Sequence, residues 1–358
     1  MLSDAAYMER ALLLAGRARG RTTPNPLVGA VVVTPDGVVA GTGFHERAGE
    51  PHAEVHALRA AGEAARGSTL YCTLEPCNHV GRTPPCVDRI LGAGVARVVA
   101  AVEDPNPLVA GRGFLRLRQA GITVDVGAGE AAARRLNRPF FSAMRRGRPY
   151  VIVKAVTSLD GRVAAAGGEP TRLSSPAADR RTHALRAEVD AIAVGSGTML
   201  ADNPLLTARG VYRSRPLTRV VFDRRLRTPV SARVFSTLDA GPLVIVAGPR
   251  APADGARALE AAGASVVTSS GGLADALRLL VPMGVQSVLV EGGPAVHAAL
   301  WRERAADAVR LVVAPRALGE AGVPWVERAV APWASWRRVS VEPCGGDVII
   351  EADVHWTD

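Results

Sequence analysis

His52 and Glu54 stand two residues apart in the chain, and Cys77 and Cys86 follow further along. One imidazole and two thiolates can hold a zinc ion tetrahedrally and leave its fourth position to a water molecule. A carboxylate beside that water can take up a proton and return it. These residue types therefore predict a hydrolytic deaminase site, with zinc on His52, Cys77 and Cys86 and with Glu54 as the proton shuttle.

Two other kinds of zinc site share part of this pattern. The metalloprotease motif is His-Glu-x-x-His, but Glu54 lies two residues after His52, so the protease pattern fails. His56 is then expected to pack rather than to bind metal. A structural zinc site in a regulator without turnover would need a fourth protein ligand, for which Cys72 is the candidate.

The elements expected around these residues bring them together. Apolar spacing predicts a helix over 52–64, and His52 then lies in its first turn, where the helix dipole favours a neutral imidazole. A β-prone run predicts a strand over 68–73, which ends just before Pro76-Cys77, the Pro-Cys pair of the zinc deaminase signature. The usual Cys-x-x-Cys spacing is absent, so a longer loop must fold back to bring Cys86 to the metal.

The first half of the chain alternates between helical and β-prone segments. This pattern predicts a layered α/β domain that ends where residues 143–149 change composition. The expected helices are 4–19, 52–64, 86–92 and 112–120, and the expected strands are 28–33, 38–43, 68–73, 95–102 and 122–126.

The second half opens with a predicted strand, 150–156, that carries Lys154. Of 43 lysines and arginines Lys154 is the one lysine, which suggests that this position needs an amine. Gly195-Ser196-Gly197 begins like a dinucleotide-binding fingerprint, but Leu200 stands where the third glycine belongs, so a standard Rossmann site is disfavoured. Further strands are expected at 191–194, 219–222, 243–247, 265–268, 287–290, 310–314 and 348–354, and a helix at 176–187.

A turn near the end of the second half has the composition of an anion site. Glu291-Gly292-Gly293-Pro294 follows a predicted strand and precedes a helix predicted over 295–303. Bare backbone N–H groups and the helix dipole would face an anion there, so the turn is either a phosphate seat or an ordinary tight turn.

The composition fits a two-domain protein with unpaired cysteines. A length of 358 residues exceeds that of one ordinary domain, and 48% hydrophobic residues can form two cores. Four cysteines are too few and too clustered for a disulfide framework, so metal binding suits them better, while Cys344 and His355 are expected to be structural or to have no role. The sequence has no membrane-spanning run and no signal-peptide pattern, which predicts a cytoplasmic protein that contacts no membrane.

The net charge of +9 bears on the partners. The basic residues are scattered, without a dense run or interleaved aromatic residues, which disfavours nucleic acid as a partner. Phosphorylated small molecules account for the excess of positive charge equally well.

Three strings of the first half resemble the bifunctional deaminase/reductases of riboflavin biosynthesis: His52–Leu58, Thr73–Cys86 and Asp104–Gly113. The resemblance implies a cytidine-deaminase-like, three-layer N-terminal domain over residues 1–146. It places the zinc ligands on His52, Cys77 and Cys86 and the proton shuttle on Glu54. It also implies substrate contacts at Asn25, His45, His79 and Arg82.

Three strings of the second half, Lys154–Gly161, Thr198–Arg209 and Val290–Pro294, resemble the reductase half of the same family. That half is similar in fold to dihydrofolate reductase, which implies an NADPH-dependent domain over residues 147–358. Many members carry a Trp where this chain has Arg172, so a guanidinium is expected in place of an aromatic cofactor contact. The other expected NADPH contacts are Val156, Thr198, Asp202, Arg224 and Gly293, and the expected substrate contacts are Lys154, Arg186, Leu206, Arg209 and Glu291.

The resemblance implies two successive reactions and a homo-oligomer, a dimer or larger, formed through the reductase half. The first would deaminate 2,5-diamino-6-(5-phosphoribosylamino)pyrimidin-4(3H)-one with zinc. The second would use NADPH to reduce the ribosyl side chain of 5-amino-6-(5-phosphoribosylamino)uracil to ribityl, with Lys154 and Asp202 orienting the sugar and Arg186 and Arg209 holding the phosphate. The competing enzyme hypothesis is a nucleic-acid or free-base deaminase whose second half is only a binding module.

Overall fold

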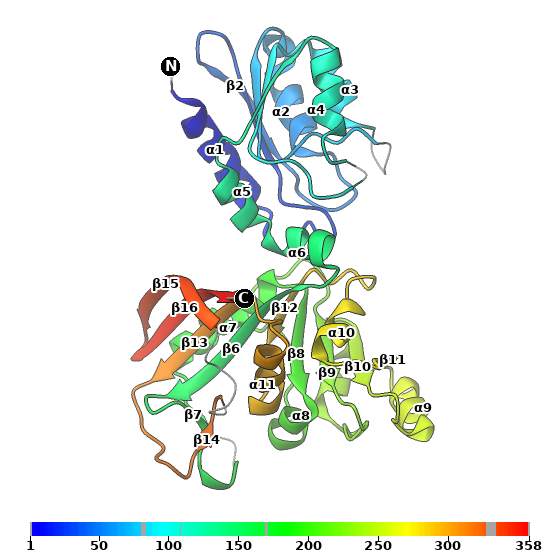
Figure 1. Ribbon diagram of the computed structural model, residues 1–358, viewed down its shortest axis with the longest axis vertical. Coiled ribbons are helices and arrows are strands. Elements are labelled where there is room, and N and C mark those ends of the chain that lie inside the picture. Colours follow the sequence, from blue (N-terminus) through cyan, green and yellow to red (C-terminus); the bar gives the residue numbers. More distant parts are fainter. Residues whose placement is uncertain (1, 80–83, 108, 169–170, 327–333, 357–358) are drawn as a thin grey trace. The chain divides into compact units, whose positions relative to one another are not determined.

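The computed structural model describes residues 2–79, 84–107, 109–168, 171–326 and 334–356. The chain forms two compact units, Met1–Gly147 and Arg148–Asp358. Each unit has its own sheet and its own hydrophobic core (Figure 1). The last helix of the first unit, α6 (Arg138–Arg146), includes part of the segment over which a boundary was expected, and it ends at Gly147, whose φ is +62°.

The first unit is built on a five-stranded sheet in the order β2-β1-β3-β4-β5. β1 pairs antiparallel with β2 and β3, whereas β3, β4 and β5 run parallel to one another. The strands are β1 (Gly29–Val33), β2 (Val39–Phe44), β3 (Thr69–Cys72), β4 (Arg97–Ala100) and β5 (Thr123–Val126). The helices are α1 (Asp4–Gly16), α2 (Ala53–Ala61), the short η1 (Gly62–Ala65), α3 (Cys86–Ala93), α4 (Arg112–Gln119), α5 (Glu130–Leu136) and α6.

Helices cover both faces of this sheet. Buried residues of α2, α3 and α4 form one core cluster with one face of the strands, and α1, α5 and α6 form a second cluster with the other face. Figure 1 shows the sheet between these two groups of helices. The predicted three-layer arrangement of the first unit is confirmed.

Two glycines of β2 let α2 lie unusually close to the sheet. A Cβ atom on Gly41 would lie 2.2 Å from the carbonyl oxygen of Ala57, and one on Gly43 would lie 2.4 Å from that of Ala53. Neither distance is sterically possible. The glycines therefore fix the depth of α2, the helix whose N-cap is His52.

The second unit contains a nine-stranded sheet in the order β11-β10-β9-β8-β12-β6-β13-β16-β15. The strands from β11 to β13 are parallel, and the hairpin of β15 and β16 adds two antiparallel strands. These strands are β6 (Tyr150–Ser158), β8 (Ala191–Gly195), β9 (Thr218–Phe222), β10 (Leu243–Ala247), β11 (Ser265–Thr268), β12 (Ser287–Val290), β13 (Ala308–Ala314), β15 (Ala334–Cys344) and β16 (Asp347–Trp356).

Helices cover the faces of this sheet as well, and a small separate sheet pairs β7 (Arg162–Ala164) with β14 (Val323–Pro324). Residues of α10 and α11 pack into one core cluster, and residues of α8, α9 and η3 pack into another. The helices are η2 (Ala166–Gly168), α7 (Pro176–Glu188), α8 (Ser196–Asp202), η3 (Arg233–Ala240), α9 (Ala253–Ala261), α10 (Leu273–Arg278) and α11 (Pro294–Arg302). β8 and β12 are parallel neighbours, so α8 and α11, which follow them, begin at the same edge of the sheet.

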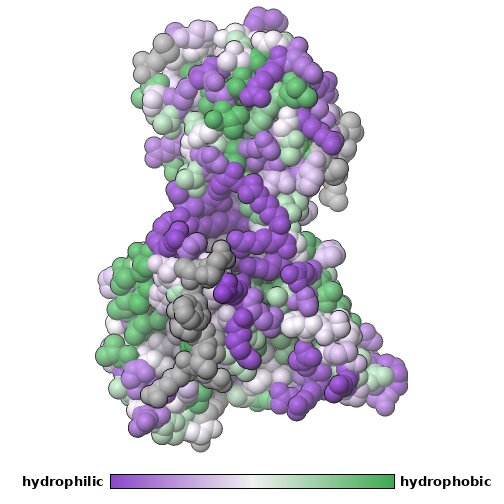
Figure 2. Space-filling view, in the orientation of Figure 1, coloured by the Kyte–Doolittle hydropathy of each residue, from purple (hydrophilic) through white to green (hydrophobic). Residues whose placement is uncertain are grey.

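The surface of both units mixes hydrophilic and hydrophobic residues, with hydrophilic ones over much of the face in view (Figure 2). Within the described part of the chain, none of the helices has the length and apolar character needed to cross a membrane.

Candidate functional site

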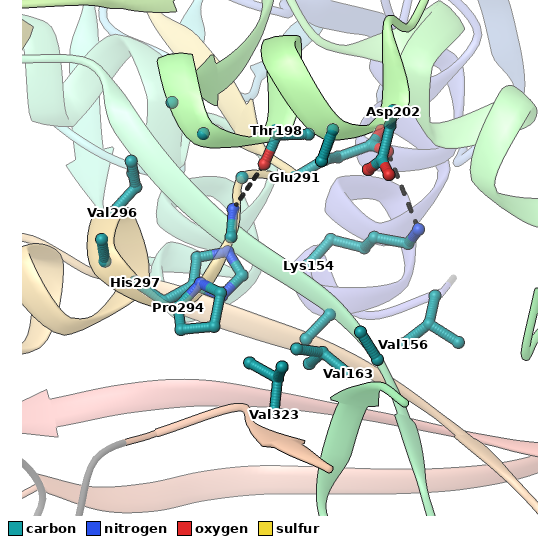
Figure 3. Close-up of a pocket in the computed structure, with 18 of the residues that line it drawn as sticks. Lys154, Val156, Val163, Thr198, Asp202, Glu291, Pro294, Val296, His297 and Val323 are labelled. Carbon is teal, nitrogen blue, oxygen red and sulfur yellow. Dashed lines mark hydrogen bonds and ion pairs between the residues drawn. The ribbon is translucent and has the colours of Figure 1, made fainter. Parts of the chain in front are cut away.

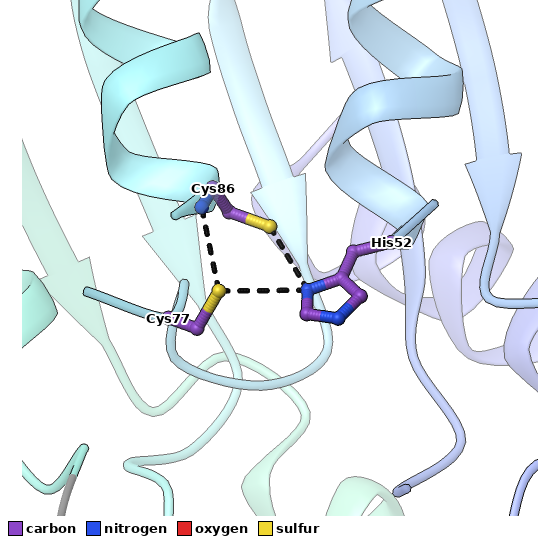
Figure 4. Close-up of side chains that lie close together, drawn as sticks. All are labelled: His52, Cys77 and Cys86. Atoms are coloured by element: carbon purple, nitrogen blue, oxygen red, sulfur yellow. Dashed lines mark hydrogen bonds between the residues drawn. The ribbon is translucent and has the colours of Figure 1, made fainter. Parts of the chain in front are cut away.

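The first unit brings His52, Cys77 and Cys86 together (Figure 4). Nδ1 of His52 lies 3.1 Å from Sγ of Cys86 and 3.5 Å from Sγ of Cys77. These three are the ligand atoms that the residues offer, and all lie within 4.8 Å of one another. Side chains that are far apart in the sequence therefore converge on one point.

Two helix N-termini position this cluster. His52 is the N-cap of α2, and Cys86 is the first residue of α3. The backbone N–H of Cys86 also donates to Sγ of Cys77 at 3.3 Å. Unpaired N–H groups and the positive ends of two helix dipoles favour thiolates at this point. The hydrogen bond from Cys86 lowers the pKa of the Cys77 thiol well below its usual value, in keeping with a metal ligand.

The spacing of the cluster fits zinc. Tetrahedral coordination with ordinary Zn–S and Zn–N lengths separates the ligand atoms by about 3.4–3.8 Å. The observed nitrogen–sulfur distances of 3.1 and 3.5 Å are close to that range. Within the described residues the cluster has three members, and Cys72 instead directs its thiol to the carbonyl of Val99 at 3.8 Å. The arrangement thus leaves one coordination position open, as a catalytic site requires.

Glu54 lies beside the cluster and is almost completely buried, with 3% of its surface exposed. Burial raises the pKa of its carboxyl group. Its Oε2 atom has no hydrogen-bond partner among the described residues. A buried carboxylate oxygen without a partner is costly in a folded protein. The position therefore suits a group that exchanges protons with a molecule bound next to the metal.

Asn25 and His45 form a pair next to His52. Nδ2 of Asn25 lies 3.0 Å from Nε2 of His45, while Nδ1 of His45 lies 3.2 Å from the carbonyl oxygen of Pro51. Since Pro51 can only accept, the His45 proton belongs on Nδ1 and Asn25 donates to Nε2. Burial lowers the pKa of His45, which keeps this neutral form. His45 thus orients Asn25 and leaves its amide oxygen available as an acceptor.

Of the two other predicted substrate contacts in this unit, His79 is exposed and Arg82 lies outside the described residues. Glu75 is a residue whose role the sequence did not indicate. Its buried carboxylate accepts backbone N–H groups of Asp104, Gly111, Gly113 and Phe114 at 2.9–3.3 Å. Glu75 therefore holds the backbone of Asp104, Gly111, Gly113 and Phe114 close to the segment that carries Cys77.

The second unit contains a cavity of about 390 Å³ at the edge where α8 and α11 begin (Figure 3). Its walls come from β6, α8, the turn after β12, α11 and the small sheet of β7 and β14. Six of the predicted contact residues line it together: Lys154, Val156, Thr198, Asp202, Glu291 and Gly293.

A buried cluster of charges lies on one side of this cavity. Arg186 donates two hydrogen bonds of 2.7 Å to the carboxylate of Glu291, and Nζ of Lys154 lies 3.7 Å from the same carboxylate. Burial alone would raise the pKa of Glu291, but the two cations outweigh it and hold that pKa at about 2. Arg186 also donates to the carbonyl of Thr207, so its guanidinium is already engaged within the protein.

The glycine turn before α11 forms another wall. The N–H of Gly293 donates to Oγ1 of Thr198 at 2.9 Å. A Cβ atom on Gly292 would lie 3.0 Å from the backbone nitrogen of Gly195, so the close approach of the two strand ends favours glycine there. The turn leaves backbone rather than side chains to face a bound molecule.

A second cavity of about 470 Å³ adjoins the first and shares Gly195, Gly197, Ala295 and Val296 with it. Three arginines that follow β9 line it: Arg224, Arg225 and Arg227. Two adjoining cavities with a bare glycine turn between cationic side chains fit an extended, phosphate-bearing dinucleotide.

The remaining predicted contacts lie apart from the first cavity. Leu206 is 2% exposed and its side chain belongs to the core, so any contact with a substrate would come from its backbone. Arg209 bonds through its guanidinium to Oγ1 of Thr207 and through its N–H to Nδ1 of His183. Arg172 is exposed and pairs with Asp179 at 3.2 Å. None of these three lines the first cavity.

Two family models match the chain. The cytidine and deoxycytidylate deaminase zinc-binding region matches residues 1–102, and the RibD C-terminal domain matches residues 149–350. The matches confirm the cytidine-deaminase-like fold expected for the first unit and the dihydrofolate-reductase-like fold expected for the second. They also confirm zinc and NADPH as the expected cofactors.

Curated proteins and solved structures resemble the chain over nearly its whole length. The riboflavin biosynthesis protein RibD of Aquifex aeolicus is 41% identical over 97% of each chain, and that of Escherichia coli is 44% identical over 89% of each. The structure of Acinetobacter baumannii RibD matches with a TM-score of 0.89 at 36% identity, covering 98% of this chain and 99% of that one. A Thermotoga maritima diaminohydroxyphosphoribosylaminopyrimidine deaminase/5-amino-6-(5-phosphoribosylamino)uracil reductase matches over the same shares with a TM-score of 0.84 at 31% identity.

Substitutions in the metal cluster separate metal binding from proton transfer. Glu54→Gln is expected to keep zinc and to lower the rate of ammonia release by about 10²- to 10⁴-fold, because a proton shuttle is lost. Cys77→Ser and Cys86→Ser are expected to lose both zinc and activity. Elemental analysis of the purified variants, together with an ammonia assay, measures both. Cys344→Ser is the control and should retain both; loss of zinc from Glu54→Gln would contradict the assignment.

Arg186 is expected to act by holding Glu291 in its ionised form. Arg186→Gln leaves the buried carboxylate with Lys154 alone, so NADPH oxidation should fall by about 10- to 100-fold. The pKa of Glu291 should rise, so the acid limb of the pH profile should move to higher pH. Arg181→Gln, which removes an exposed arginine of the same helix, is the control. An unchanged acid limb in Arg186→Gln would rule out this role.

Proposed function

The chain belongs to the RibD family of riboflavin biosynthesis proteins, and from this premise we propose its two substrates and the residues that act on each. It is a bifunctional enzyme, a zinc-dependent deaminase and an NADPH-dependent reductase. The proposed substrates are a diaminohydroxyphosphoribosylaminopyrimidine for the deaminase and 5-amino-6-(5-phosphoribosylamino)uracil for the reductase. The similar Thermotoga maritima enzyme, which is named for these two compounds, supports this choice.

The observation that carries the deaminase assignment is the Oε2 atom of Glu54, which has no partner among the described residues and lies beside a three-ligand cluster. When bound, zinc supplies an activated water at neutral pH. Glu54 would carry the two protons of that water in turn, one to the ring nitrogen of the pyrimidine and one to the departing amine, so that ammonia leaves and the water oxygen remains as the new carbonyl. Asn25, oriented by His45, offers its amide oxygen to a donor group of the pyrimidine.

In the reductase, NADPH, when bound, would supply the hydride for the proposed reduction at C1′ of the opened ribose. Lys154 and Asp202 line the cavity and are placed to orient the sugar hydroxyls. Glu291, held by Arg186, adds a fixed acceptor near the amine of Lys154. Arg209 is the proposed partner of the 5-phosphate, since the guanidinium of Arg186 is engaged with Glu291. The glycine turn and the arginines of the second cavity suit the phosphates of NADPH.

The competing hypotheses lose support. A structural zinc regulator needs a closed coordination shell, and the candidate fourth ligand, Cys72, directs its thiol elsewhere. A free-base or nucleic-acid deaminase with a second half that only binds ligand is disfavoured by the match of that half to the reductase domain of this family.

We further propose that the chain forms a homo-oligomer, a dimer or larger, through the second unit. β15 is one of the two edge strands of the nine-stranded sheet and exposes Trp336, Val339 and Val341. Hydrophobic residues are visible in Figure 2 at the edge where Figure 1 draws β15. An unprotected edge with apolar side chains supports pairing with a second copy. The free thiols that bind zinc support a cytoplasmic location.

Light scattering of the purified protein during size exclusion tests the oligomer. We expect a mass of at least two chains, and Val341→Lys, which places a charge on the exposed edge, should shift the protein toward the monomer. A wild-type protein that elutes as a monomer at all concentrations would refute the proposal.

The loss of NADPH absorbance tests the sequence of the two reactions. Zinc-loaded wild-type protein is supplied with 2,5-diamino-6-(5-phosphoribosylamino)pyrimidin-4(3H)-one. It is expected to release ammonia and then to oxidise NADPH. Glu54→Ala should oxidise NADPH only when it is supplied with the deaminated uracil. Such a result would show that the deaminase feeds the reductase.

Two results would contradict the proposal. If the wild type releases ammonia but never oxidises NADPH, the reductase substrate is misassigned. If Glu54→Ala consumes NADPH with the diamino compound, deamination does not precede reduction.

A further inference from the structure

The reductase cavity has one wall that does not come from the nine-stranded sheet or its helices. Val163 and Ala164 of β7 and Val323 of β14 line the cavity. In Figure 3, Val163 and Val323 lie on the side of the cavity opposite Thr198 and Asp202. The small sheet of β7 and β14, here called the outer wall, therefore faces whatever molecule occupies the cavity.

The outer wall is weak as a sheet. β7 has three residues and β14 has two, and the register pairs Val323 with Ala164 and Pro324 with Arg162, with an irregularity between them. So short a ladder has little stability by itself. Asp160 accepts N–H groups of Leu318 and Gly319 at 3.1 and 2.8 Å, but these bonds join the two arms of the wall to each other.

A side-chain hydrogen bond connects the outer wall to α11. Trp325 follows β14 directly, and its Nε1–H donates to Nδ1 of His297 at 2.9 Å. His297 lies on α11, one turn after the glycine turn, and lines the same cavity. α11 thus contacts both sides of the cavity, through the Gly293 N–H bonded to Thr198 and through His297 bonded to Trp325.

His297 is suited to accept this bond permanently. It is 2% exposed, and burial together with the nearby Lys154 lowers its pKa to about 4 despite the opposite influence of Glu291 and of the Val290 carbonyl. The ring therefore stays neutral near pH 7, and the N–H donor of Trp325 places the lone pair on Nδ1. The rings of His297 and Trp325 also pack edge to face, with 6.3 Å between their centroids.

We propose that the Trp325–His297 hydrogen bond holds the outer wall against α11, which makes both residues positioning residues for NADPH. The proposal rests on the assignment of the glycine turn of this cavity to NADPH in the proposed function. Neither residue needs to touch the reacting atoms. The bond fixes the distance between the bare glycine turn, which receives the cofactor, and the apolar residues of β7 and β14 that cover it.

A matched pair of tryptophan substitutions tests this role. Trp325→Phe keeps an aromatic ring but removes the donor, so the Kd and KM for NADPH are expected to rise about five- to thirty-fold, with a smaller change in kcat. Trp301→Phe is the control, because Trp301 contacts Trp325 in the same cluster while its own buried Nε1 has no partner among the described residues. This control should leave the NADPH affinity unchanged, and ammonia release should be normal in both variants.

Variants of His297 provide an independent test in which Trp325 is unchanged. His297→Asn keeps an acceptor close to the position of Nδ1 and is expected to bind NADPH nearly as well as the wild type, whereas His297→Leu should match Trp325→Phe. In the double variant His297→Leu/Trp325→Phe, the loss of affinity should not exceed that of either single variant, because both remove the same bond.

Fluorescence titration measures the Kd for NADPH, and steady-state kinetics measure KM and kcat. The proposal is overturned if Trp325→Phe binds NADPH as tightly as the wild type, or if the losses from the two single substitutions add in the double variant. A wild-type protein that fails to bind NADPH would instead refute the assignment of the cavity. If Trp325→Phe does not fold, the contrast between His297→Asn and His297→Leu decides.

Discussion

The start of a helix presents a positive dipole, and backbone N–H groups that have no partner within the helix, to one point in space. In the first unit the start of α3 provides this at Cys86, next to the N-cap of α2 at His52. In the second unit α11 begins at the cavity, directly after Gly293, whose N–H donates to Oγ1 of Thr198. Both reactions involve anionic groups, thiolates in the first and phosphates in the second. The backbone therefore supplies positive potential at each site before any side chain contributes.

Three buried carboxylates show how surroundings determine what a carboxylate does. Glu75 accepts four backbone N–H groups and so fixes a loop. Glu291 is held between two cations and stays ionised. Glu54 has an oxygen that no described residue satisfies, and burial raises its pKa. Three glutamates thus have three different roles: Glu75 stabilises a loop, Glu291 is a fixed hydrogen-bond acceptor and Glu54 carries protons.

Much of the metal site could be predicted because its chemistry is local in the sequence. His52 and Glu54 lie at the start of one helix, and Cys77 follows shortly after the end of a recognisable strand. The roles of Glu75, His297 and Trp325 could not be predicted, since each depends on a partner far along the chain. The exposed strand β15 was missed because its residues do not alternate between buried and exposed positions. Short strands such as β7 and β14 contain too few residues to show the alternation of apolar and polar side chains that identifies a strand in a sequence.

The scarcity of lysine gives the reductase site an unusual chemical property. Apart from the α-amino group at the start of the chain, Lys154 carries the one primary amine of the 358 residues. Its side chain is 13% exposed and lines the cavity. A reagent selective for amines, such as one that introduces isotope-labelled methyl groups, would therefore mark a single side chain. The resonance of that group would report the state of the reductase cavity without interference from any other lysine.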